Sequence, residues 1–190
     1  MKAKRFLGIL LLAGIVILAI GCNNGSTDTT YNIGDTGPGG GKVFYDKRDN
    51  TGGWRYLEAA PVNQATYGVD GLAWASSSFE STDISGTLTA IGTGKSNTAL
   101  ILATDPDAPA ALVCKNYNGG GKNDWFLPSK DELNEFYEQR SIFGIGDPAL
   151  PYWSSSQDNY YLVCIQNFAT GFQGYSDKPN TFTVRAIRAF

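Results

Sequence analysis

The sequence predicts an α+β fold, in which a single domain carries two or three helices and ends in an antiparallel meander. Three observations support this prediction. Strand-like segments come first, helical segments follow, and the last third of the chain is divided into short apolar or alternating runs. This order differs from the strand–helix alternation that is typical of parallel sheets. The chain has 190 residues, which suits one domain after a leader segment is set aside.

The first 22 residues have the pattern of a secretory leader. Three cations precede an uninterrupted apolar run over residues 6–20, and the small residue Gly21 stands before Cys22. The run is short for a membrane-spanning helix. The pattern resembles the bacterial lipoprotein signal, which implies that residues 1–21 are removed and that Cys22 is lipidated. An ordinary secretory signal with an incidental cysteine is the alternative.

The polar segment that follows predicts a flexible tether, so that residues 22–33 join a lipid anchor to the domain. The expected location is the bacterial cell envelope, with the membrane as a partner through the lipid. Asn23 stands where, by analogy with lipoprotein sorting, Asp retains proteins at the inner membrane. This residue favours the outer membrane or the cell surface.

Charge and residue usage exclude several classes of function. The chain has a net charge of −3, which becomes −6 when the three leader cations are lost. An acidic protein is a poor partner for nucleic acid. The sequence contains no histidine, so Ser-His and Cys-His nucleophile pairs and His-ligated metals cannot form. We therefore expect no enzyme, no cofactor and no bound metal.

Cys114 and Cys164 are the only cysteines left if Cys22 carries lipid. An extracytoplasmic compartment permits a disulfide between them, which would close a loop of roughly fifty residues and contribute about 3 to 4 kcal/mol in the chain-entropy model. Two buried free thiols are the alternative.

The first two strands are predicted at residues 42–45 (KVFY) and 54–60 (WRYLEAA), after the glycine-rich turn GPGGG. A short helix is predicted over residues 96–103. Asp107 is expected to cap a second helix that runs through Cys114 and stops before three successive glycines.

The third helix has the clearest local signal in the chain. Ser129 and Glu132 have the S-x-x-E spacing of a capping box, and apolar residues follow at helical spacing. This pattern predicts a helix over residues 130–140. Strands are then predicted at residues 152–155, 160–168, 172–175 and 181–190, which together form the expected meander.

The motifs GPGGGKVFY, NDWFLPSKDEL, YWSSS and VRAIRAF occur in that order. They resemble the extracytoplasmic bacterial family named for the C-terminal domain of the Lcl collagen-like adhesin, which is related to the Fibrobacter major paralogous domain. The resemblance covers residues 34–190. It implies a C-type-lectin-like fold and glycans as the ligand class, sulfated ones included, although the acidic charge argues against sulfated glycans.

Aromatic and polar side chains of the chain suggest a ligand-binding surface. Trp74, Trp125 and Trp153 are either a platform for sugar stacking or core side chains. Two later turns have the Tyr, Ser, Asn and Gly composition of adaptable binding loops. Their candidate ligand-binding residues are Asn159, Tyr160, Tyr161, Gln173 and Tyr175.

Acidic side chains suggest two further sites, each with a simpler interpretation. The first is a calcium site, for which the candidate ligands are Asn123, Asp124, Asp105, Asp107 and the DKPN segment at residues 177–180. The lectin motif has Glu or Gln before its proline, whereas this segment has a lysine there. Glu58, Glu132 and Glu135 offer carboxylates for a glycosidase, whereas capping and solvation explain the last two. Arg185 and Arg188 are expected to pair with buried carboxylates.

The residues and the resemblance together predict a lipid-anchored, non-catalytic protein that presents a lectin-like domain for adhesion to glycans or extracellular matrix. The alternative is a structural or protein-partner lipoprotein of the envelope without a glycan site. A homo-oligomer fits either interpretation.

Overall fold

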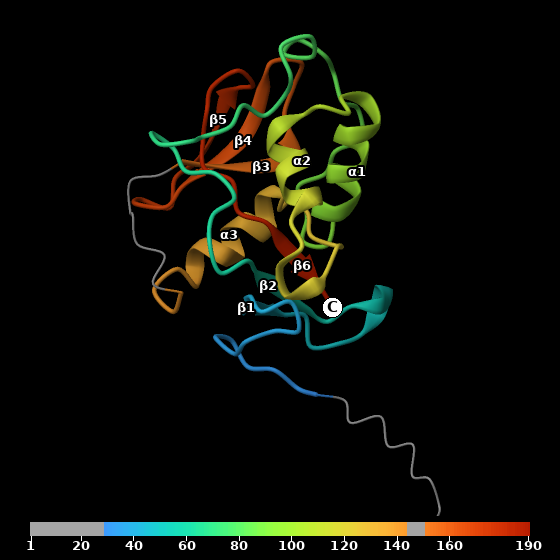
Figure 1. The fold of residues 1–190 in the computed structure, drawn as a ribbon, viewed down its shortest axis with the longest axis vertical. Coiled ribbons are helices and arrows are strands. Elements are labelled where there is room, and N and C mark those ends of the chain that lie inside the picture. Colours follow the sequence, from blue (N-terminus) through green and yellow to red (C-terminus); the bar gives the residue numbers. More distant parts are fainter. Residues whose placement is uncertain (1–28, 144–150) are drawn as a thin grey trace, which may run out of the picture. The chain divides into compact units, whose positions relative to one another are not determined.

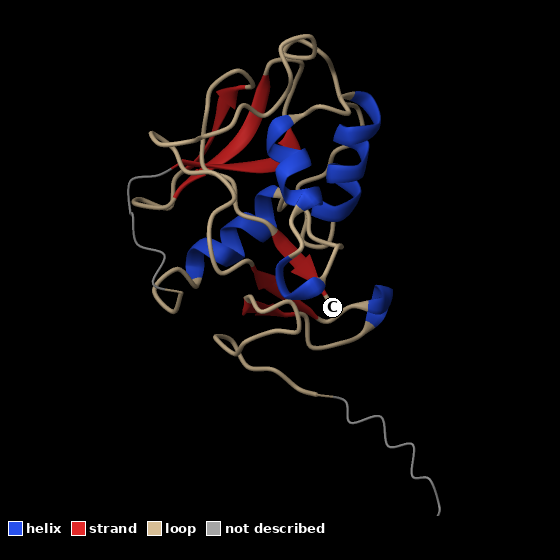
Figure 2. Cartoon of the chain, in the orientation of Figure 1, coloured by secondary structure: helices blue, strands red, loops and turns tan. Residues whose placement is uncertain are grey.

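The structure is a computed structural model that describes residues 29–143 and 151–190. The leader and Cys22 lie outside the described residues. One compact unit extends over Tyr31–Phe190. Within the described part it contains three α-helices and two three-stranded antiparallel sheets (Figures 1 and 2). The α+β prediction is therefore confirmed.

The first sheet joins the beginning of the domain to its end. Its order is β1 (Lys42–Asp46), β2 (Tyr56–Ala59) and β6 (Ile187–Ala189). All four residues of the central strand β2 are buried. Figure 1 shows the last strand of the chain beside one of the first.

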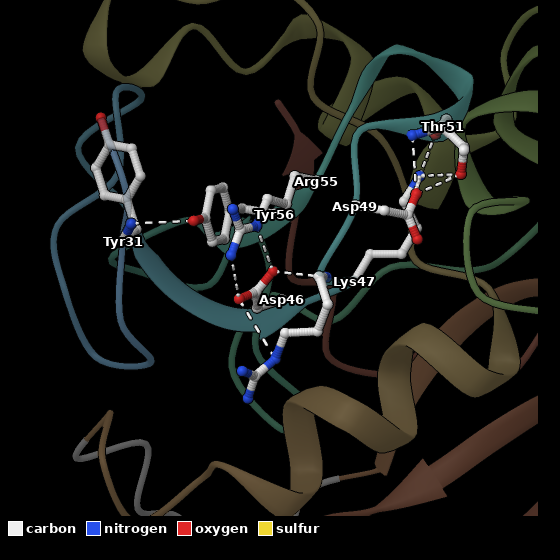
Figure 3. Close-up of polar contacts among 8 residues, drawn as sticks. Tyr31, Asp46, Lys47, Asp49, Thr51, Arg55 and Tyr56 are labelled. Atoms are coloured by element: carbon white, nitrogen blue, oxygen red, sulfur yellow. Dashed lines mark hydrogen bonds and ion pairs between the residues drawn. The ribbon is translucent and has the colours of Figure 1, made fainter. Parts of the chain in front are cut away.

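The hairpin between β1 and β2 is held by charged side chains (Figure 3). Arg55 donates two hydrogen bonds to Asp46, at 2.7 and 3.0 Å, and the backbone N–H of Arg48 donates a third. These hydrogen bonds, led by that of Arg55, lower the pKa of Asp46. Lys47 also contacts Asp49 and Thr51. This network fixes an exposed turn.

The second sheet is a meander of β3 (Pro151–Gln157), β4 (Leu162–Asn167) and β5 (Gln173–Asp177). The prediction of one meander that included residues 181–190 is wrong, because this segment leaves the second sheet. Thr183 makes only a single parallel bridge to β3, and β6 then pairs with β2. Residues 183–188 are all buried, although two of them are arginines, so this segment follows a path through the interior.

The three helices lie close to their predicted positions. They are α1 (Gly94–Thr104), α2 (Pro109–Asn116) and α3 (Lys130–Glu138). The cap of α2 was predicted wrongly, because the helix is preceded by Ala108 and starts with a proline, which suits a first helical turn by its fixed φ. The capping box of α3 is confirmed.

Helix α3 contacts strands of both sheets, namely β1 of the first and β3 and β4 of the second. One cluster of buried side chains contains Trp74, Trp125 and Trp153. A second cluster contains Phe136 of α3 and Leu57 of β2. The core is therefore built from residues that are distant in the sequence.

Candidate functional site

The three tryptophans proposed for sugar stacking belong to the core. Trp74 and Trp153 are 0% exposed and Trp125 is 1% exposed. The indole N–H of Trp74 donates to the backbone oxygen of Ser154, and that of Trp153 donates to the backbone oxygen of Leu72, both at 2.8 Å. None of the three presents a ring face to a sugar, which corrects the proposal of a tryptophan platform.

Cys114 and Cys164 are both buried and both free. The predicted disulfide is absent, and the alternative of two buried thiols describes the structure. They lie on different elements, Cys114 on α2 and Cys164 on β4, which pairs with β3 and β5. Burial raises the pKa of both thiols, that of Cys164 to about 11, so neither is an activated nucleophile.

Four exposed aromatic side chains belong instead to the second sheet and its turns. Tyr160 and Tyr161 lie in the β3–β4 turn and are 58% and 57% exposed, and Tyr175 on β5 is 53% exposed. Phe172, in the β4–β5 turn, is the most exposed of the group at 66%. We call these four residues the aromatic edge, because they follow the outer strand β5 and the turns at its two ends.

The two polar candidates position this surface. The side-chain oxygen of Asn159 accepts hydrogen bonds from the N–H groups of Tyr161 and Leu162 and so shapes the turn. The Gln173 amide donates to the backbone oxygen of Lys130 at the start of α3 and to the side chain of Gln166, both at 3.1 Å. Both side chains therefore already have partners within the protein.

Phe172 was missed by the sequence analysis as a site residue, because its alternating pattern indicated an ordinary strand position. A Cβ added at Gly174 would lie 2.5 Å from the Phe172 ring. The ring therefore lies across this glycine, on one side of β5. The spacing of Phe172 and Gly174 was the only sequence signal for this arrangement.

Strand β5 forms an open edge of the second sheet, since no described strand pairs with its outer side. At the two ends of the β4–β5 ladder, backbone hydrogen bonds join Phe172 to Asn167 and Lys178 to Tyr161. Because bonding alternates along an antiparallel strand, the backbone groups of Gln173 and Tyr175 point away from β4. Exposed aromatic residues thus lie on an open edge strand and in the turns next to it, with Phe172 over Gly174 on one face and Tyr175 on the other.

The buried carboxylates proposed as acid and base are engaged in structural contacts. Glu58 is fully buried, accepts hydrogen bonds from the N–H groups of Gly39 and Gly41, and forms an ion pair with Arg188 at 2.9 Å. Arg188 also pairs with Asp124 at 2.5 Å. The expected carboxylate partners are confirmed for Arg188, and the cluster ties β2 to β6.

Glu132 is held by the start of its own helix. Its carboxylate accepts hydrogen bonds from the N–H groups of Ser129 and Gly92, at 2.7 and 2.8 Å. Burial raises the pKa of Glu132 to about 7, and these hydrogen bonds oppose that rise. The side chain of Glu132 is therefore one half of the capping box of α3.

The proposed calcium ligands are dispersed. Asp105 is buried and accepts hydrogen bonds from the backbone and side chain of Ser76, both at 2.8 Å. Among residues 29–143 and 151–190, no three His, Cys, Asp or Glu side chains gather into a group that could hold a metal ion. None of the helices in these ranges is long and apolar enough to span a membrane.

A cavity of about 250 Å³ lies where α1 meets the segment before α3, and Lys95, Leu102, Asp124 and Trp125 line part of it. A more open hollow of about 450 Å³, lined in part by Trp54, shares Lys95. The cavity is lined by Trp125, one of the three tryptophans considered for sugar stacking, and by Asp124, one of the imagined calcium ligands. The more open hollow is lined by none of the residues that the sequence analysis proposed for ligand binding.

Comparison with known proteins defines a fold and no family. No family model and no curated protein matches the chain. Among solved structures, the chain is similar to a fimbrial protein from Bacteroides ovatus, with a TM-score of 0.53 and 15% sequence identity. The match covers 79% of this chain and 44% of that protein, so this chain corresponds to less than half of its neighbour.

Proposed function

We propose that this protein is a lipid-anchored adhesion module of the bacterial surface, and that the aromatic edge binds glycans without catalysis. Ring faces of Tyr and Phe stack on the apolar faces of sugar rings, and the hydroxyl of tyrosine adds a hydrogen-bonding group. The proposal needs no cofactor and places the protein in the cell envelope.

One observation carries the proposal. Four aromatic side chains of one small sheet are each more than half exposed, although the tryptophans of the chain lie mostly in its core. An exposed aromatic group of this kind is a typical mark of an interaction site. The likeness to a fimbrial protein and the resemblance to the Lcl C-terminal family, with its C-type-lectin-like fold, support a surface role.

A glycan array tests this proposal. Soluble protein comprising residues 23–190, which includes the whole compact unit, is applied with and without calcium and sulfated polymers. We expect saturable binding that is independent of calcium and weakened by Tyr160→Ala or Tyr175→Ala. Tyr67→Ala is the matched control, because Tyr67 is also exposed but lies outside the aromatic edge. A blank array from folded protein would refute the glycan proposal.

The open edge of β5 favours a second candidate, in which another protein chain adds a strand to this sheet. Edge strands with unpaired N–H and C=O groups accept such strands. Asp177→Pro removes an outward N–H from β5 while leaving the aromatic edge in place. Sedimentation velocity measures the outcome: concentration-dependent assembly that this substitution abolishes supports the second candidate, and a monomer at all concentrations refutes self-assembly by this route.

A further inference from the structure

Arg185 is a buried cation without a carboxylate partner. Its side chain is only 6% exposed, and Nη1 donates to Oδ1 of Asn63 at 2.8 Å. Among the described residues, its buried Nε has no hydrogen-bond partner. No acidic side chain of this part of the chain forms an ion pair with it, in contrast to Arg188, which has two carboxylate partners.

Burial without a counter-charge is unfavourable for a guanidinium. Desolvation lowers the pKa of Arg185 to about 10, and the ring of Phe136 lies 5.9 Å from its Cζ. Buried charges in proteins are normally paired, because an unpaired buried charge has lost its hydration without gaining a compensating interaction. An anion bound beside Arg185 would supply the missing partner.

A cavity with suitable walls lies beside this side chain. It has a volume of about 120 Å³, and its lining includes Lys42, Ala59, Ala60, Pro61, Phe143 and Arg185. We call it the Arg185 pocket. Lys42 is exposed, and its Nζ donates to the backbone oxygen of Gly34 at 3.2 Å, which holds a second cation at this site.

From this arrangement we propose that the Arg185 pocket binds the carboxylate of a small organic or sugar acid. The planar fork of arginine matches a planar carboxylate, and the small apolar walls leave room for a few carbon atoms. The volume corresponds to roughly four water molecules, which excludes a large ligand from the pocket itself. The proposal involves binding alone and no chemical step.

The Arg185 pocket goes beyond the adhesion proposal and is independent of it. Its lining comes from β1 and the segment before it, the end of β2, the segment after α3 and the segment before β6. The aromatic edge, in contrast, follows β5 in the second sheet. Failure of glycan binding at the aromatic edge would therefore not affect this inference, and the reverse also holds.

Thermal unfolding of the full chain tests the proposal. Sodium acetate, sodium glucuronate and sodium sulfate are titrated separately against sodium chloride at matched ionic strength. Ligands that bind the folded state raise the unfolding midpoint with concentration. We expect a saturable rise with acetate or glucuronate, and the stronger of the two identifies the acid class as simple or sugar-derived.

Substitutions connect this effect to the pocket. Lys42→Ala, at an exposed position, should weaken the apparent affinity several-fold. Arg185→Met should abolish the anion effect, and it should not lower stability without anion, because it removes an unpaired buried charge. Lys115→Ala, at another exposed lysine, is the control and should leave the titration unchanged.

Three results would overturn the proposal. The first is a midpoint that does not rise saturably with acetate or glucuronate. The second is a rise that persists in both Lys42→Ala and Arg185→Met. The third is a rise with sulfate alone, which would show that the pocket does not select a carboxylate.

Discussion

Lys178 shows how a single residue can contradict the simplest interpretation of a sequence. A lysine in the segment DKPN suggests a solvated turn, yet its side chain is 0% exposed. Its Nζ donates to the backbone oxygen of Thr82 and lies 5.2 Å from the centre of the Trp74 ring. Burial lowers the pKa of Lys178 to about 8, and Asp83 and Asp105 oppose this shift.

The lowered pKa of Lys178 predicts that this residue reduces the free energy of unfolding by an amount that depends on pH. Between about pH 8 and pH 10.5 the unfolded chain holds a proton on Lys178 that the folded chain has lost, so this residue's contribution to stability improves as pH rises. Lys178→Met should therefore stabilise the protein most below pH 8, and its advantage should shrink towards pH 10.5. Urea unfolding of both proteins at several pH values measures the difference.

The comparison with Lys178→Met cancels the other groups that titrate in this range, including the two cysteines. Lys95→Met, at an exposed lysine, is the control and should show no such trend. A Lys178→Met advantage that stays constant from pH 7 to pH 10.5 would contradict this account of the buried lysine.

Glu58 and Arg188 form the clearest buried ion pair, and the side chain of Glu58 is fully buried. Although burial opposes the charged form, hydrogen bonds to Asp124 and Glu58 raise the pKa of Arg188. Glu58→Gln should cost about 3 kcal/mol of unfolding free energy, since it leaves a buried cation with one carboxylate fewer. Denaturant unfolding measures this loss.

Glu138→Gln, at an exposed position of α3, is the control and should change the free energy of unfolding little. An equal loss in both variants would contradict a stabilising role for the Glu58–Arg188 ion pair.

Among the elements, α3 was predictable because its signal is local. Ser129 and Glu132 specify the start of the helix by themselves, and both reciprocal hydrogen bonds are present. The cap of α2 was not predictable in the same way. The helix starts at Pro109 after Ala108, and the N–H of Asp107 donates to the carboxylate of Asp105, which also accepts from Ser76.

The role of the last strand also could not be predicted, because pairing partners depend on the whole chain. Residues 181–190 read as a further strand of the meander, and their apolar pattern is equally compatible with a path through the interior. In the structure β6 pairs with β2, whose four residues are all buried, and not with a strand of the second sheet. The exposed tyrosines at 160, 161 and 175 were predicted from the composition of their turns. The tryptophan platform was predicted wrongly, because residue type alone does not show whether a side chain is buried.

The start of α3 gives a prediction at this scale. Ser129→Ala removes the cap that accepts from the Glu132 N–H, and also a hydrogen bond of 2.9 Å to the backbone oxygen of Ala90. We expect a loss of about 1 to 2 kcal/mol in unfolding free energy, measured with urea. Ser81→Ala, in an exposed turn, should have almost no effect. A loss below about 0.5 kcal/mol at Ser129 would show that the capping box contributes little.

At the scale of the whole molecule, the two sheets differ in their contacts and in their exposed residues. The first sheet, closed by β6 and the Glu58–Arg188 pair, joins the beginning of the compact unit to its end. The second sheet carries the aromatic edge and an open strand. Helix α3 contacts both sheets, so the sheet with the exposed aromatic residues rests on a well-packed support.

The most direct test of this account is the dissociation constant of the strongest-binding glycan, measured for wild type and for Tyr160→Ala, Tyr161→Ala and Tyr175→Ala. The account predicts about tenfold weaker binding for at least two of these variants, which corresponds to about 1.4 kcal/mol for each, with Tyr67→Ala unchanged. Equal affinities for wild type and all three variants would contradict the assignment of the aromatic edge as the binding surface.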